Sequence, residues 1–156
     1  MDINMDFGVK RESIPHSAVS VAAYIVHYCN RKGYLINNLK LQKILYFVQA
    51  QFLVNRGRPC FKEKIEAWQF GPVVPEVYHK YKFYGGTAIK SSNQYKMWNI
   101  SNDDKKEIEV IVDECAKYST SQLVNITHKQ TPWLKAYSEN KHNHISNESI
   151  FEYFSI

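Results

Sequence analysis

The stretch from Leu39 to Gly86 constrains the fold more than any other part of the chain. It contains a helix-like apolar pattern, a Gly-Arg-Pro stop at 57–59, a short aromatic segment and a Gly-Pro-Val-Val-Pro turn, with almost no filler. Glycine and proline fix where the backbone can turn, so we expect these elements to pack into one compact unit. The stretch supplies no evident nucleophile, metal cage or phosphate loop, which favours a binding protein over an enzyme.

Apolar residues recur at helical spacing along most of the chain. Ser17 and either Asn37 or Asn38 are expected to cap the first two helices, and Gly33 and Gly57 to end them. In the second helix the predicted buried stripe is Leu41, Ile44, Leu45, Val48 and Phe52, while the polar side chains Lys40, Gln42, Lys43, Gln49 and Gln51 mostly fall on other faces. Further helices are predicted to begin at Pro75, at Ser101, within 119–121, at Thr131-Pro132 and before Ile150.

The extended structure is expected to be small. Residues 65–70 alternate in the manner of a short strand, and a second strand is predicted around 95–100. The predicted fold class is therefore mainly α, a compact helical domain with a small β element. Residues 1–16 are expected to form a flexible N-terminal lead-in, followed by a single domain over 17–156.

Charge and cysteine usage narrow the class of partner. The chain has 20 basic and 15 acidic residues, a net charge of +5, but the basic residues are scattered, which argues against nucleic acid as the main partner. The first two helices and their GYLINN connection are kept as a minor helix-turn-helix hypothesis, although this connection is longer than the usual one. With no long apolar run and no signal-peptide core, we predict a cytoplasmic protein without membrane contact. Cys29, Cys60 and Cys115 are expected to be reduced and buried.

Candidate chemical groups are sparse. His142 and His144 lack further metal ligands nearby in sequence and are interpreted as a solvated loop, so neither a metal nor a cofactor is predicted. One enzymatic alternative remains, in which His128 acts as a general base in a pocket near Lys40 and Gln42.

The segment Trp68–Tyr78, which we call the elbow, is the hardest to explain by packing alone. Its glycine and two prolines leave the backbone little entropy to lose on binding. Trp68, Phe70 and Tyr78 are residue types enriched at binding hot spots. The alternative interpretation, in which the aromatic residues belong to the core and the turn is only a connector, stays open.

Four motifs together resemble one known family. LKLQKILYFVQA, GRPCF, EAWQFGPVVPEVYHKYKFYG and ITHKQTPW are similar in order and spacing to the Panacea domain of the SocA-like antitoxins, from about Ser17 to Phe154. The resemblance implies a mainly helical antitoxin of a bacterial or prophage toxin–antitoxin pair that neutralises a cognate toxin by direct contact. One family member delivers its toxin to a Clp-type protease, so such a protease is a second expected partner. The stretch after Gly86 follows no family pattern, as expected for a variable, partner-specific loop.

The motifs and the elbow predict two sets of residues, one for partner binding and one for the fold. The predicted partner-binding residues are Lys40, Gln42, Lys43, Tyr46, Trp68, Phe70, Val74, Tyr78 and His128. The predicted structural residues are Leu41, Gly71, Pro72, Pro75, Val77, Pro132 and Trp133. We expect the polar members Lys40, Gln42, Lys43 and His128 to lie outside the core. A phage-encoded modulator that binds a host protein is the alternative function from another class.

Overall fold

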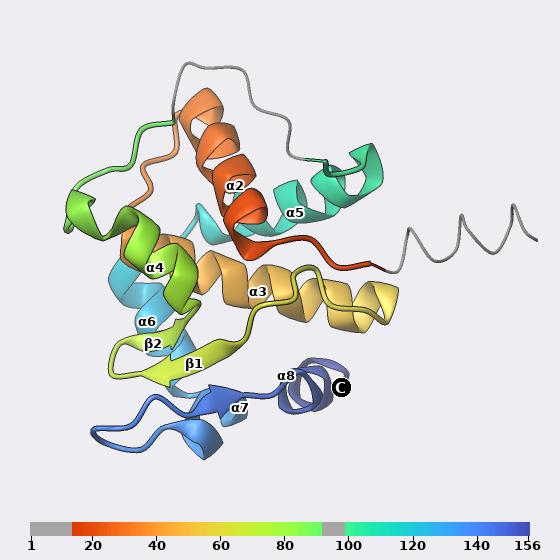
Figure 1. Cartoon of the computed structure of the whole chain (residues 1–156), viewed down its shortest axis with the longest axis vertical. Helices are drawn as coiled ribbons and strands as arrows, with labels where there is room; N and C mark the ends of the chain where they lie inside the picture. Colours follow the sequence, from red (N-terminus) through yellow and green to blue (C-terminus); the bar gives the residue numbers. More distant parts are fainter. Residues whose placement is uncertain (1–13, 92–98) are drawn as a thin grey trace, which may run out of the picture.

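The fold is organised around one central helix. The computed structural model describes residues 14–91 and 99–156. Helix α3 (Asn38–Arg56) crosses the middle of the molecule and packs against α2 (Ala18–Lys32), α4 (Pro75–Tyr81), α5 (Asn102–Cys115), α6 (Thr120–His128) and α8 (Asn147–Phe154) (Figure 1). The short helix α7 (Thr131–Ala136) and the 3₁₀ turn η1 (Lys82–Tyr84) complete the helical part. The predicted mainly α class is confirmed.

The helix boundaries follow the local signals in the sequence. The side chains of Ser17, Asn37, Ser101 and Ser119 each accept a hydrogen bond from a backbone N–H in the first turn of the helix that follows. Gly33 and Gly57 end α2 and α3 in the left-handed conformation that glycine adopts most easily. These helix starts and stops are confirmed.

A small antiparallel sheet lies below α3, with strand order β2-β1-β3 (Figure 1). Strand β1 (Ile65–Trp68) confirms most of the strand predicted over 65–70. Residues 71–73 were expected to belong to the Gly-Pro-Val-Val-Pro turn, but Gly71–Val73 forms β2 and pairs back on β1. Strand β3 (His144–Ile145) arises in a segment that we interpreted as a polar loop. Of the strand predicted around 95–100, residues 95–98 lie outside the described residues, and 99–100 are not in a strand.

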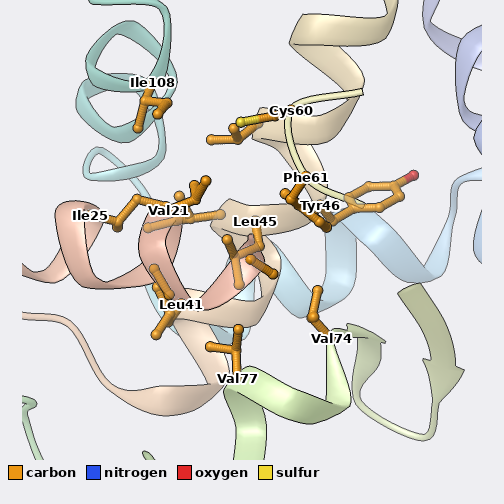
Figure 2. Close-up of a cluster of buried hydrophobic side chains, with 14 of the residues drawn as sticks. Val21, Ile25, Leu41, Leu45, Tyr46, Cys60, Phe61, Val74, Val77 and Ile108 are labelled. Atoms are coloured by element: carbon orange, nitrogen blue, oxygen red, sulfur yellow. The ribbon is translucent and has the colours of Figure 1, made fainter. Parts of the chain in front are cut away.

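The hydrophobic core gathers side chains from the whole length of the chain. Figure 2 shows Val21 and Ile25 of α2, Leu41 and Leu45 of α3, and Ile108 of α5 converging on one cluster. Phe61, Val74 and Val77 enter the same cluster from the β1–β2 region and its flanks. The elbow is therefore anchored in the main core at its base.

The body of the domain begins before Ser17. Residues 1–13 of the predicted lead-in lie outside the described residues, but His16 is fixed. Its N–H donates to the carbonyl of Cys60 at 2.8 Å, and its carbonyl accepts from Lys62 at 3.1 Å. Within 14–91 and 99–156, no helix is long and apolar enough to cross a bilayer.

Candidate functional site

The elbow is a tight hairpin that continues directly into a helix. Trp68 pairs with Gly71 across β1 and β2, so Gln69 and Phe70 alone form the turn. Val74 then precedes α4, and Pro75 occupies its first turn, where the missing N–H costs nothing. Such a turn presents the side chains of Gln69 and Phe70 at its tip.

Polar side chains of α3 hold the elbow from inside. The Val74 N–H donates to Gln42 Oε1 at 2.9 Å, and Gln42 Nε2 donates to Asn38 Oδ1 at 2.9 Å. Asn38 Nδ2 then donates to the carbonyl of Tyr78 at 3.0 Å. Both α3 side chains are buried, so this chain of hydrogen bonds satisfies backbone groups that water cannot reach.

Lys43 lies directly beneath the hairpin. Its ammonium group is completely buried and donates to the carbonyl of Pro72 at 2.9 Å. Burial lowers the pKa of this amine to about 7, because the charged form loses its hydration. A Cβ atom at Gly71 would lie 2.6 Å from Lys43 Cε and 2.9 Å from the hydroxyl oxygen of Thr127. Only glycine leaves room for the lysine at this crossing.

The structure corrects the expectation that the polar residues of α3 lie outside the core. Gln42 and Lys43 are fully buried, and so are Tyr46 and Val74, which were also predicted to contact a partner. Tyr46 donates its hydroxyl to Gln130 Oε1 at 2.8 Å. The reason is that α3 has neighbours on all sides, so its polar face meets backbone groups of the elbow and of nearby loops instead of solvent. Gln42 and Lys43 thus hold backbone groups of the elbow, Tyr46 holds Gln130, and the buried side chain of Val74 belongs to the elbow itself.

Lys40 lies at the margin of this arrangement. It is partly buried, and its ammonium group donates to the carbonyl of Tyr118 at 2.7 Å, beyond α5. It thus belongs to the α3–α5 side of the molecule and not to the elbow.

The outer face of the elbow is aromatic. Trp68 is partly buried, lies 5.0 Å from the ring of Tyr78 and stacks on His142 at 4.4 Å. Phe70 is 56% exposed at the tip of the turn. His128 is partly exposed, and its Nε2 lies 2.9 Å from the carbonyl of Gln69. The structure therefore brings together Trp68, Phe70, Tyr78 and His128 from the predicted set.

The predicted structural residues lie in or beside the core. Trp133 is buried, its ring lies tilted against that of His128 with centroids 4.2 Å apart, and its indole N–H donates to the carbonyl of Trp68 at 2.8 Å. It thereby links α7 to the end of β1. The remaining members, Leu41, Gly71, Pro72, Val77 and Pro132, are buried, and Pro75 is partly buried.

Sequence reasoning missed the contribution of the C-terminal part. Asn143 accepts a hydrogen bond from the N–H of Ala67, and His144 pairs with Glu66 across β3 and β1. This pairing carries His142 onto Trp68. No local signal in the SENKHNHISN segment marks it, because its partner strand lies about 80 residues earlier in the chain. Among the described residues, no group of three or more His, Cys, Asp or Glu side chains could hold a metal ion.

A separate apolar pocket of about 200 Å³ opens between α3, α5 and α6. Its lining includes Phe47, Ile111, Cys115 and Leu123, and none of Lys40, Gln42 and His128. Burial raises the pKa of the Cys115 thiol to about 12, so the thiol is protonated at neutral pH. The three side chains of the enzymatic alternative each form hydrogen bonds with different partners. Lys40 bonds Tyr118, Gln42 bonds Val74 and Asn38, and His128 bonds Gln69.

Fold and site together define a small, mainly helical domain that presents a rigid aromatic turn. Residues 41–134 match the family described as Antitoxin SocA-like, Panacea domain, and the protein belongs to this family. Antitoxin SocA of Caulobacter vibrioides (strain NA1000 / CB15N) is 38% identical over 109 residues, which make up 63% of this chain and 58% of that protein. The chain thus spans a little over half the length of this relative. No solved structure matches the chain.

Proposed function

We propose that this protein is an antitoxin that neutralises a cognate protein toxin by direct binding, with the outer face of the elbow as its contact surface. The observation that carries the proposal is a fully supported turn with an exposed aromatic tip. Phe70 is 56% exposed, and the backbone on either side of it is held by hydrogen bonds to the side chains of Gln42, Lys43 and Trp133. Family membership and the name of the relative support the antitoxin role.

Rigidity is the physical advantage of such a surface. Association is opposed by the entropy lost when loops and side chains become ordered, and a turn that is already ordered avoids that loss. Trp68 and Tyr78 contact each other and flank the tip, so the aromatic face is also arranged before binding. We infer that the toxin is silenced by occlusion, through an interface of ordinary size, about 1,600 Å² in total.

Co-expression with the product of the neighbouring gene tests this proposal. If that product is the toxin, the wild-type protein should restore growth and should co-purify with it. Phe70→Ala should weaken the complex about 30-fold, corresponding to the roughly 2 kcal/mol of a binding hot spot, and should reduce the rescue. Binding is measured by titration calorimetry with the purified pair.

Phe151→Ala provides a matched control. Phe151 is also a phenylalanine, is 45% exposed and lies on α8, away from the elbow. This variant should bind the toxin like the wild type. Equal loss of binding in both variants, or none in either, would count against the elbow as the contact surface. Absence of both rescue and complex would overturn the antitoxin proposal itself.

The fate of the toxin separates occlusion from delivery to a Clp-type protease. Occlusion predicts that toxin accumulates in the complex at the same level in cells with and without the protease. Toxin that disappears only when the protease is present would assign the adaptor route instead. A stable complex with a host protein, and none with the neighbouring product, would point to the modulator alternative.

A further inference from the structure

One end of the molecule combines exposed apolar side chains with unbalanced positive charge. It consists of residues 31–35, at the end of α2, and residues 79–90, from the end of α4 through η1 and the segment that follows; we call it the basic end. Figure 1 shows the segment after α4 running beside the connection between α2 and α3. A hydrogen bond of 2.7 Å from the Ile89 N–H to the carbonyl of Ile36 joins the two.

Two large apolar side chains stand out at this end. Phe83 is 81% exposed and Leu35 is 79% exposed, more than any other large hydrophobic residue in the described ranges except the C-terminal Ile156. Phe83 rests against Tyr84, with ring centroids 4.4 Å apart. Single exposed apolar residues are ordinary, but two of the most exposed ones at one end of the molecule indicate an interaction surface.

The backbone beneath these side chains is well fixed. Asn30 donates to the carbonyl of Ile89 at 3.2 Å and accepts from the Ser91 N–H at 2.6 Å. The side chain of Ile89 is buried, and the Tyr84 hydroxyl donates to the carbonyl of Lys90 at 3.3 Å. The exposed side chains are therefore displayed on an ordered frame, and their exposure is not that of a loose chain end.

The charged residues that belong to this end are all basic. Residues 30–36 and 77–91 contain no Asp or Glu, but they include Arg31, Lys32, Lys80, Lys82 and Lys90, all exposed. Within the described ranges none of these five cations has a carboxylate within 4.0 Å; Arg31 and Lys32 lie over the ring of Tyr28, and Lys80 over Tyr81. Asp113 approaches from α5, but it accepts from the hydroxyls of Tyr28 and Tyr34.

We propose that the basic end is a second docking surface, which binds an acidic polypeptide segment carrying an apolar side chain. The apolar side chain would contact Phe83 and Leu35, while the surrounding carboxylates would face Lys80, Lys82 and Lys90. Charge complementarity identifies the partner's chemistry and also speeds association. We commit to a polypeptide and not a nucleic acid, because the aliphatic side chain of Leu35, unlike the ring of Phe83, gives a base no face to stack on but packs well against an apolar side chain. The surface is separate from the aromatic face of the elbow and does not depend on the proposed antitoxin function.

The probe is a labelled synthetic peptide that is rich in Asp and Glu and has a central Phe-Leu pair. Its binding to the protein is measured by fluorescence anisotropy. The full-length protein should bind it, with an affinity that falls as salt rises, because surface charges are screened beyond about 10 Å at 0.1 M ionic strength. Phe83→Ser and Lys82→Glu should each weaken binding about tenfold. The same peptide with serine in place of the Phe-Leu pair should bind about tenfold more weakly to the wild type.

Matched controls sit on α5. Val110→Ser changes a 60% exposed apolar residue and Lys106→Glu reverses an exposed charge, and neither should alter peptide binding by more than about twofold. Phe70→Ala should leave peptide binding intact even where it impairs toxin neutralisation. Either proposal can therefore be rejected without rejecting the other. Undetectable peptide binding, unchanged binding by Phe83→Ser, or tighter binding of a single-stranded oligonucleotide sensitive to the same variants would each overturn the proposal.

Discussion

A buried amine without a carboxylate partner is costly, and Lys43 is such a group. Among the described residues it takes part in no ion pair, and its ammonium group donates to the carbonyl of Pro72. The polar end of the side chain thus gives a hydrogen bond to a buried carbonyl near the turn. Gly71 makes this crossing possible, because any Cβ would occupy the space of the lysine stem.

The titration of Lys43 makes stability depend on pH. Its pKa is about 7 in the folded protein and 10.5 ordinarily, so between these values the unfolded chain binds more protons. Stability therefore rises with pH across this window, by up to about 1.4 kcal/mol per unit. We expect the free energy of unfolding of the wild type to increase relative to that of Lys43→Met between pH 7 and 9, as measured by urea denaturation.

The comparison with Lys43→Met is needed because other groups act in the opposite direction. Burial raises the pKa of Cys29 to about 12 and that of Tyr28 also to about 12, so their stabilising contributions are lost as the unfolded chain ionises above about pH 9. They are the same in both proteins and cancel in the difference. A difference that stays constant from pH 7 to 9 would show that Lys43 does not titrate in this range.

Gly71→Ala tests the close approach of the hairpin to α3. Gly71 has φ +109°, which L side chains rarely adopt, and the added Cβ would lie 2.6 Å from Lys43 Cε. We expect a loss of roughly 2–4 kcal/mol in the free energy of unfolding. Gly86→Ala is the control, because nothing lies within 4 Å of its added Cβ, and it should change stability by less than about 0.5 kcal/mol. Equal stability of the two variants would contradict the steric account.

At the scale of elements, a charged network joins three segments that are distant in sequence. Asp104, in the first turn of α5, accepts from Arg56 at 2.7 Å, from Arg58 at 3.0 Å and from His16 at 2.8 Å. Glu107 accepts from Gln51, Asn55 and Arg56. The C-terminal end of α3, the loop after it and the segment before α2 are therefore all tied to the beginning of α5.

Asp104→Asn should loosen this junction. The substitution leaves Arg56 and Arg58 without their shared carboxylate, and Arg58 already keeps one buried N–H group, Nη1, unpaired among the described residues. Removing one partner of a buried pair costs about 3 kcal/mol or more, and we expect roughly 2–4 kcal/mol at pH 7. Asp103→Asn is the control, since this exposed neighbour offers only its backbone carbonyl to Arg56.

The effect of Asp104→Asn should fade at low pH. Burial raises the pKa of Asp104, but hydrogen bonds from His16 and Arg58 and their charges outweigh it, so the folded-state pKa lies below the ordinary value. The carboxylate stabilises the fold above its unfolded pKa of about 4, and this contribution is lost as the pH falls below that value. Urea denaturation between pH 3 and 7, in approximate steps of one unit, should show the two proteins converging. A difference that is independent of pH would indicate a packing effect alone.

At the scale of the whole molecule, exposed and buried phenylalanines have different roles: the exposed ones are proposed to bind partners, and the buried one stabilises the fold. Phe70 and Phe83 lie near opposite ends of α4, and both are mostly exposed, whereas Phe61 is completely buried in the core. Under the two proposals, the same helix connects the toxin-contacting elbow with the basic end. Because neither Phe70 nor Phe83 belongs to the core, changes at one surface should leave the other surface and the fold intact.

The double variant Phe70→Ala/Phe83→Ser tests this separation. Exposed positions usually change stability by less than about 0.5 kcal/mol each, and distant changes add, so the double variant should stay within about 1 kcal/mol of the wild type. Phe61→Ala, by contrast, should cost about 3–5 kcal/mol by leaving a cavity. Urea denaturation provides the measurement. A large loss in the double variant would mean that one of these side chains supports the fold.

The course of the helices could be predicted from local signals. Caps such as Ser17, Asn37 and Ser119, and stops such as Gly33 and Gly57, act within a few residues, and their positions are confirmed. The sheet could not be predicted in the same way. Strand β3 contributes two residues whose partner lies in β1, and a Gly-Pro pair that normally breaks a strand here forms part of β2.

The sequence indicated which segments come together at the candidate site, but not which of their side chains are buried. The motifs pointed to α3, the elbow and the stretch around His128, and the structure brings these together. Polarity suggested that Gln42 and Lys43 lie outside the core, but both are buried under the elbow. The error has a physical cause. A polar side chain can satisfy its hydrogen bonds with buried backbone groups as well as with solvent or a partner.

The sequence by itself determined the helix boundaries, the mainly α class and the family, because these depend on short-range chemistry and on motifs. Only the tertiary structure decided which polar side chains lie inside, which aromatic residues remain exposed and which distant segments form the elbow's outer face. Those properties depend on neighbours that are far apart in the chain. The role of Lys43 therefore follows from the surroundings of α3 on every side, and not from its own hydrophilic character.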